Sequence, residues 1–239
     1  EAGFEAVSAF GGLVHTEATP YWPHPEVMRA AQFTPDVPVE DVLKKAATRW
    51  VGEANAADLV DAWGAVEDAL VHMPHIPLYS VFGFVWLRTW IRPLVPDIEA
   101  IPKEDRSYYE RFIVSTDNNT NINDLGKDVL FELITQESGE RMAGQMDDNA
   151  LPRLDAALDQ IRQLVDGADN DATRAVYTDL LDRTRALHCW VTTQRNTCAW
   201  VGDVYGYLSA ETDEQRDAHT TSLQRTIDLD VANAKRLLE

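Results

Sequence analysis

The residues best suited to chemistry lie near the start of the sequence, in "HTEATPYWPHP" over residues 15–25. His15 and Glu17 can supply hydrogen bonds or relay a proton, as a general acid or base does. Tyr21 and Trp22 carry rings that can stack on the apolar face of a sugar or on another aromatic group. The alternative is a connector that its prolines stiffen on the way into a helix.

A second candidate is the polar run "STDNNTNIND" over residues 115–124, in which Asn118 and Asn119 are the proposed binding residues. Amide and carboxylate oxygens can line a carbohydrate pocket or bind a cation. The run matches no calcium loop, because it lacks the glycine and the terminal bidentate glutamate at the required positions. Asn and Asp also favour turns and helix caps, which is the alternative role.

A third candidate is Arg195 in "HCWVTTQRNTCAW", residues 188–200. It shares one face of the predicted helix with His188 and Thr192, and together with Gln194 it interrupts an otherwise apolar helix. A buried arginine needs a carboxylate or a carbonyl opposite it. That partner is either an acid on a neighbouring helix or part of a ligand.

The common catalytic and metal-binding signatures are absent: the sequence has no glycine-rich phosphate loop, no HExxH and no GxSxG. Its two cysteines, Cys189 and Cys198, lie on one predicted helix about 13 Å apart by helical rise. That distance is too great for a disulfide between them, so we expect two thiols. We also expect no metal site and no cofactor.

Composition describes a folded, strongly acidic chain. Its 239 residues are 45% hydrophobic, and 40 acidic residues stand against 21 basic ones, for a net charge of −19. Such a surface disfavours nucleic acid and anionic membranes, whose phosphates need clustered Lys and Arg. No apolar run approaches the roughly 18 residues of a membrane span. A halophilic source explains the acidity, and an acidic mesophilic protein is the alternative.

The elements that must position these residues are helices. Apolar residues at helical spacing predict helices over residues 39–50, ended by Gly52, and 55–73, with Asn55 as N-cap. Further helices are predicted from Pro102, over residues 123–146, and over 151–167, ended by Gly167. Between Pro74 and Pro102 the chain is irregular and aromatic, which indicates either a functional loop or a cover for the core.

Two long helices complete the sequence. The first runs over residues 171–210 without a proline, and the second runs from Thr212 to Leu238 and carries Leu223, Ile227, Val231, Ala234 and Leu238. The short break between them predicts an antiparallel hairpin. No strand alternation appears. We therefore predict an all-α fold, a bundle of about seven helices that ends in a long antiparallel pair.

The order of these features resembles one region of a known group of enzymes. The segment from "HTEATPYWPHP" through "VEDVLKKAATRWVG" and "ADLVDAWGAVEDAL" is similar to a junction in large bacterial and archaeal glycoside-hydrolase-like proteins, in the style of α-glucuronidases and hexosaminidases. There the last turn of a TIM-like barrel runs into a C-terminal helical region. "RPLVPDIEAIPKEDRSYYERF" and "HCWVTTQRN" resemble further parts of that region.

The resemblance implies that residues 1–34 are the end of an upstream barrel-like domain with its connector, an α/β-barrel remnant, and that 35–239 form a helical domain. Catalytic carboxylates would then lie at barrel strand ends, outside this chain. The first residue is Glu and no signal peptide follows, so we expect a truncated N-terminus and a cytoplasmic protein.

The function expected on this basis is a helical accessory domain of a carbohydrate-active enzyme, which supports the barrel and contributes to the substrate cleft or a dimer interface. The expected partners are the upstream barrel, a carbohydrate ligand and, as an option, a second copy in a homodimer, with no nucleic acid and no membrane. Two alternatives stay open. One is a helical interaction module whose Pro74–Pro102 segment docks a protein partner, and the other is a stand-alone helical-bundle enzyme.

Overall fold

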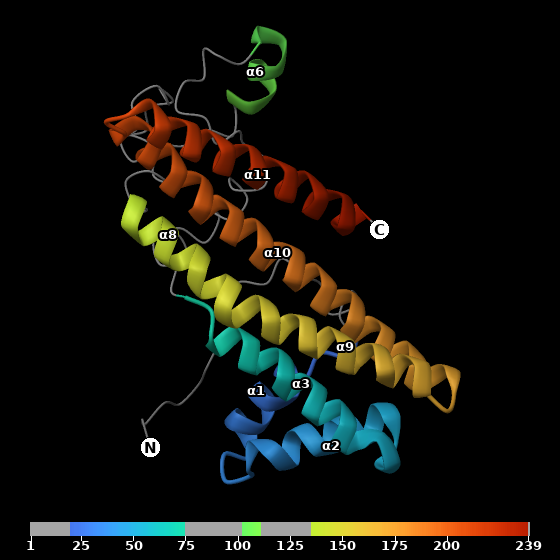
Figure 1. The fold of residues 1–239 in the computed structure, drawn as a ribbon. Coiled ribbons are helices and arrows are strands. Elements are labelled where there is room, and N and C mark those ends of the chain that lie inside the picture. The colour runs from blue at the N-terminus through green and yellow to red at the C-terminus, as the bar shows by residue number, and fades with distance from the viewer. Residues whose placement is uncertain (1–19, 75–101, 111–134, 239) are drawn as a thin grey trace. The chain divides into compact units, whose positions relative to one another are not determined.

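The computed structural model describes residues 20–74, 102–110 and 135–238, and it confirms the all-α fold (Figure 1). Every regular element in these ranges is helical, and no strand occurs among them. The chain divides into two compact units: Glu1–Asp68 with Leu154–Arg185, and Ala69–Arg153 with Ala186–Glu239. We call them unit 1 and unit 2. Of residues 1–34, predicted to be the end of a barrel-like domain with its connector, residues 1–19 lie outside the described ranges, and the α/β-barrel remnant stays a prediction.

Unit 1 is built from helices whose ends follow local rules. Its elements are α1 (His24–Phe33), α2 (Val39–Val51), the 3-10 turn η2 (Glu53–Asn55), most of α3 (Ala56–Val71), most of α9 (Leu151–Gly167) and the first part of α10 (Asp171–Ser209). Helix α2 ends at Gly52, whose φ of +80° suits a residue without a side chain. Helix α10 starts where the Asn170 side chain accepts from the Thr173 amide at 3.0 Å.

An aromatic and aliphatic core holds unit 1 together. Leu59 and Tyr177 are buried at its centre with Ala47, Val51, Ala56 and Val176. The Trp50 and Trp63 rings meet edge to face, with centroids 5.8 Å apart. Asn55, the predicted N-cap of α3, instead donates from its side chain to the Val51 carbonyl at 3.0 Å, so it closes the end of α2.

Unit 2 contains α6 (Lys103–Glu110), α8 (Gln136–Gln145), the π-helical segment η5 (Met146–Ala150), the start of α9, the second part of α10, and α11 (Asp213–Leu238). Thr135 caps α8 in a reciprocal pair with Ser138. Thr212 caps α11: its hydroxyl accepts from the Gln215 amide, and the Gln215 side chain accepts from the Thr212 amide. The predicted bounds of the last two helices are therefore correct to within one residue.

The π segment joins α8 to α9 without the break that the sequence analysis placed between residues 146 and 151. In it the Leu151 amide donates to the Met146 carbonyl, a wider ring than that of an α-helix. Pro152 follows directly. Because proline has no N–H and its ring crowds the carbonyl four residues earlier, the wider turn accommodates it. Residues 123–134 of the predicted helix lie outside the described residues.

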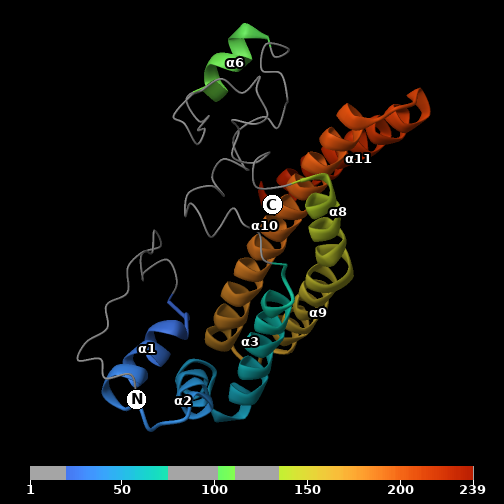
Figure 2. The ribbon, with the colours of Figure 1, turned by 90° about the vertical axis from the view of Figure 1, so that its left-hand side faces the viewer.

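The second part of α10 and α11 form the predicted antiparallel hairpin (Figures 1 and 2). Contacts step in opposite directions along the two helices: Asp203 meets His219 and Ser222, whereas His188 meets Arg236 near the far end. On α10, Val191, Cys198 and Val201 are buried, and so is Gln194, at 1% exposed.

Candidate functional site

The described residues include three of the seven candidates from the sequence. His15, Glu17, Asn118 and Asn119 lie outside the described ranges, as do residues 75–101 of the aromatic segment. Tyr21, Trp22 and Arg195 are described, but the first two belong to unit 1 and the third to unit 2.

Tyr21 and Trp22 have different surroundings. The Tyr21 ring lies edge-on to Trp50, with centroids 5.9 Å apart, and packs against the core of unit 1. Trp22 is 38% exposed, and its ring centroid lies 5.1 Å from that of His24. Of the two rings proposed for sugar stacking, Trp22 is the one that is open to solvent.

Arg195 binds Asp147 of the π segment in unit 2. The Asp147 carboxylate accepts from Arg195 Nε at 2.9 and 3.1 Å and from Nη2 at 2.7 Å. This two-pronged geometry matches the arginine fork to both carboxylate oxygens. Of the partners expected opposite Arg195, the structure shows a carboxylate on a neighbouring helical segment.

Polar side chains line the contact between α10 and α11, and we call this row the polar seam. Its members are His188, Thr193, Asn196 and Asp203 on α10 and His219, Ser222, Asp230, Asn233 and Arg236 on α11. The signal that could have revealed it is a polar stripe at helical spacing on α11, which His219, Ser222, Thr226, Asp230 and Asn233 form.

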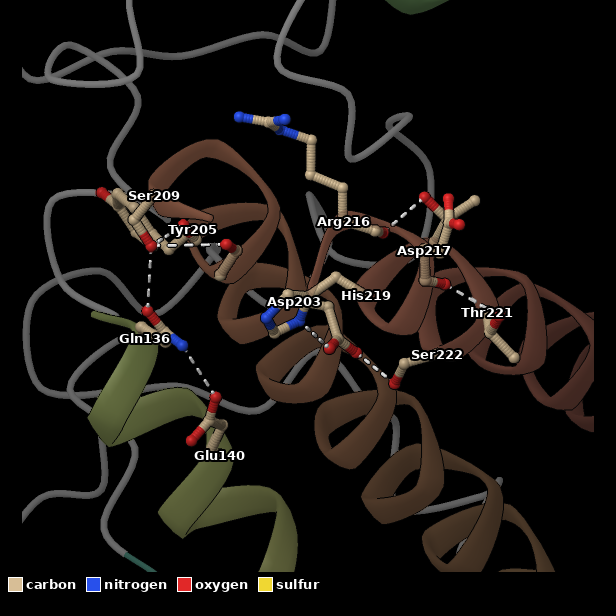
Figure 3. Close-up of polar contacts among 12 residues, drawn as sticks. Gln136, Glu140, Asp203, Tyr205, Ser209, Arg216, Asp217, His219, Thr221 and Ser222 are labelled. Carbon is tan, nitrogen blue, oxygen red and sulfur yellow. Dashed lines mark hydrogen bonds and ion pairs between the residues drawn. The ribbon is translucent and has the colours of Figure 1, made fainter. Parts of the chain in front are cut away.

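At the end near the turn, the Asp203 carboxylate serves two side chains of α11 (Figure 3). His219 Nδ1 lies 3.0 Å from Asp203 Oδ1, and the Ser222 hydroxyl donates to Asp203 Oδ2 at 2.5 Å. A carboxylate beside an imidazole is also the geometry that orients a catalytic base. Here, however, the Ser222 hydroxyl donates to the carboxylate, and the Ser209 hydroxyl donates to the Tyr205 carbonyl at 2.8 Å. The described geometry therefore serves to tie two helices together.

In the middle of the seam, Asn196 donates from its side-chain amide to Asp230 at 3.1 Å. Burial raises the pKa of the Asp230 carboxyl above its ordinary value, and the hydrogen bond from Asn196 offsets part of that rise. The buried Asn196 Oδ1 accepts no hydrogen bond from any residue that the structure describes. Each of these features costs stability, so the seam is a weaker contact than an apolar one of the same size.

At the far end, Asn233 and Arg236 of α11 bind α10. Asn233 is 4% exposed and donates to the Cys189 carbonyl at 2.7 Å and to the Thr193 hydroxyl at 3.0 Å. Arg236 Nη2 lies 2.8 Å from His188 Nδ1, which must accept, because arginine has only donors.

Cys198, one of the two predicted thiols, is buried inside unit 2. Burial raises the pKa of its thiol to about 12. The thiolate, the reactive form, is therefore scarce at neutral pH. Across the described ranges there is no cluster of three His, Cys, Asp or Glu side chains that could hold a metal ion. Within those ranges no helix has the length and apolar character to cross a bilayer.

Most apolar residues of α11 are exposed rather than buried. The residues of this helix that are fully buried are Thr226 and Asn233, both polar. The five apolar residues singled out in the sequence, Leu223, Ile227, Val231, Ala234 and Leu238, form what we call the apolar row. Ile227 is 41%, Val231 49% and Leu238 89% exposed, whereas Leu223 is half-buried. In this part of the chain, polar contacts join the helices and an apolar face is left open.

Comparison with known proteins adds no relative: no family model, no curated protein and no solved structure matches the sequence.

Proposed function

We propose that unit 2 is a helical interaction module, in which the apolar row of α11 is the docking surface for a helical protein segment. The observation that supports this proposal is the distribution of residues on α11. Its fully buried residues are polar, whereas most of its apolar row is exposed. This differs from the interaction module expected from the sequence, which placed docking on Pro74–Pro102.

Single exposed apolar side chains are ordinary, whereas a continuous row marks an interaction surface. Ile227, Val231, Ala234 and Leu238 recur at steps of three and four residues, the spacing with which one helix anchors against another. Burying this surface is favourable by about 25 cal/mol for each Å² of apolar area removed from water. The seam already fixes α11 on α10, so the row can bind without reorganising the hairpin.

Accessibility of the row in the folded chain tests the proposal. We expect Ile227→Cys and Val231→Cys to react with a maleimide in dilute, folded protein at 0.1 M NaCl, where self-association is weakest, as fast as the control Ala232→Cys, which is exposed on another face of α11. The wild type provides the background, since Cys189 and Cys198 are both buried. An Ile227→Cys variant that is labelled at the new thiol only after unfolding would contradict the proposal.

A second candidate function is the expected accessory role in a carbohydrate-active enzyme, which the exposed ring of Trp22 favours. Titration of uronic acids and amino sugars against tryptophan fluorescence tests it, in a chain joined to its upstream part. We expect the tryptophan fluorescence to change when a sugar is added. The Trp22→Phe variant should lose this change and the Trp63→Phe variant should keep it. The absence of a fluorescence change with every sugar tested would contradict this role.

A further inference from the structure

We infer that the partner of the apolar row is a second copy of the chain, with α11 packed antiparallel on α11 of the copy. This inference rests on the proposed function, and it adds the identity, direction and register of the partner.

The direction follows from the charges at the two ends of α11. Its first turn carries Asp213 and Glu214, and its last turn carries Lys235 and Arg236. A parallel copy would set like charges side by side, whereas an antiparallel copy sets each acidic end toward a basic end. The helix dipoles also oppose one another in the antiparallel arrangement, which is the favourable one.

The register follows from the spacing of one acidic and one basic residue. Asp217 and Lys235 are both exposed and lie eighteen residues apart, which is five turns, so they share one flank of the helix. In an antiparallel pair a two-fold axis brings the same flanks together. An axis beside Ile227 places Asp217, ten residues before it, within about 3 Å along the helix of Lys235 of the second copy, which lies eight residues after it, and this happens twice per dimer. The same axis sets Leu223 opposite Val231 of the copy and the two Ile227 side chains against each other.

Net charge sets the conditions for this association. Each copy carries −19, so two copies repel at long range in dilute buffer. The screening length falls from roughly 10 Å at 0.1 M salt to about 3 Å at 1 M, whereas the apolar contact is not weakened by salt. We therefore expect the dimer to be tighter at 1 M NaCl than at 0.1 M.

Sedimentation equilibrium of the full chain at 1 M NaCl tests the inference. We expect a dimer for the wild type, a dissociation constant raised more than tenfold by Ile227→Asp, and no such change for the control Ala232→Asp. The Ile227→Cys variant should form a disulfide-linked dimer on mild oxidation, because this residue lies beside the two-fold axis. The Ala232→Cys variant should not.

Charge exchange, measured at the lowest NaCl concentration at which the wild type forms a dimer, tests direction and register. Asp217→Lys and Lys235→Asp should each weaken the dimer several-fold, because each places two like-charge pairs in it. The double variant should restore the wild-type affinity. If both single variants had the same dimer dissociation constant as the wild type, the antiparallel register would be overturned.

A wild-type chain that stays monomeric at every salt concentration would overturn the second copy as partner. The thermal midpoint of Ile227→Asp then separates this failure from that of the proposed function. An unchanged midpoint with fast labelling of Ile227→Cys leaves the docking surface in place for a different protein. A lowered midpoint with slow labelling means that the chain itself covers the row, and it overturns both proposals.

Discussion

In the polar seam, the surroundings of Asp230 disfavour the charged form of its carboxyl. Burial raises its pKa, and one hydrogen bond from Asn196 offsets part of that effect. Because the folded chain holds the proton more tightly than the unfolded chain, the stability that Asp230 contributes is fully present below its unfolded pKa. It is lost as the pH rises through the raised folded value.

Asp230→Asn removes this charge and keeps an oxygen that can accept from Asn196. We expect the variant to have a larger free energy of unfolding than the wild type at pH 7. The difference should shrink as the pH falls toward the unfolded pKa of about 4, where the wild-type carboxyl is also neutral. Urea unfolding at a series of pH values measures it. A variant less stable than the wild type at pH 7 would show that the charged form is stabilised in the seam.

Arg195 was a candidate for ligand binding, and its pairing with Asp147 gives a different prediction. We expect Arg195→Ala to lower the free energy of unfolding by about 1–3 kcal/mol, because a side chain only 19% exposed loses its charge-assisted bonds. The Arg195→Ala, Asp147→Ala double-mutant cycle should give a coupling of about 1 kcal/mol. A coupling near zero would mean that Asp147 does not stabilise Arg195, and Arg195 would again be a candidate for a ligand contact.

The need for an acceptor opposite Arg195 could be predicted from the sequence, but neither the type nor the identity of that acceptor could. A guanidinium that is largely removed from water requires an acceptor wherever it lies, so a carboxylate or a carbonyl was expected. Asp147, however, lies 48 residues away, in a segment whose π turn the sequence did not reveal. The contact between Asp203 and His219, sixteen residues apart on two helices, could not be predicted for a similar reason, since neither residue type specifies its partner.

At the scale of elements, helix starts and ends were the most predictable features. Gly52 and Gly167 end α2 and α9, and Thr212 begins α11 as expected, because glycine and capping residues act over one turn of chain. The face that a helix buries was less predictable. Periodicity indicates an apolar stripe, but which neighbour covers that stripe depends on contacts between distant segments.

The close approach of α10 and α11 near their turn depends on Gly206. The His219 ring lies against it so closely that a methyl group at this position would overlap all three ring atoms nearest to it. We expect Gly206→Ala to displace the ring from Asp203 and to lower the free energy of unfolding by about 1–3 kcal/mol. Chemical denaturation measures this loss.

Gly64→Ala is the matched control for that substitution. Gly64 lies inside α3, is exposed, and has no atom within 4 Å of an added methyl group. Alanine there should therefore add about 0.5–1 kcal/mol through its higher helix propensity. A Gly206→Ala variant that gains stability by the same amount would mean that the His219 ring moves aside without loss.

At the scale of the whole molecule, excess acid is the dominant feature. The sequence has forty acidic and twenty-one basic residues. Several of the described ion pairs join residues three positions apart on the exposed face of a helix, such as Asp159 with Arg162. Such local pairs stabilise little. The acidic excess therefore acts mainly as mutual repulsion within each folded chain, a term that grows as the salt concentration falls.

Salt should therefore stabilise the fold itself, as the halophilic source expected from the composition requires. We expect the free energy of unfolding to rise steeply between 0.1 and 1 M NaCl, where screening shortens from roughly 10 Å to 3 Å, and more gently above that. Urea, which is uncharged, is the suitable denaturant. The Ile227→Asp variant serves as the control that separates this effect from dimer formation, since its response to salt then belongs to the monomer. A monomer equally stable at 0.1 and 2 M NaCl would show that the acidic surface is accommodated without screening, and it would contradict the halophilic interpretation.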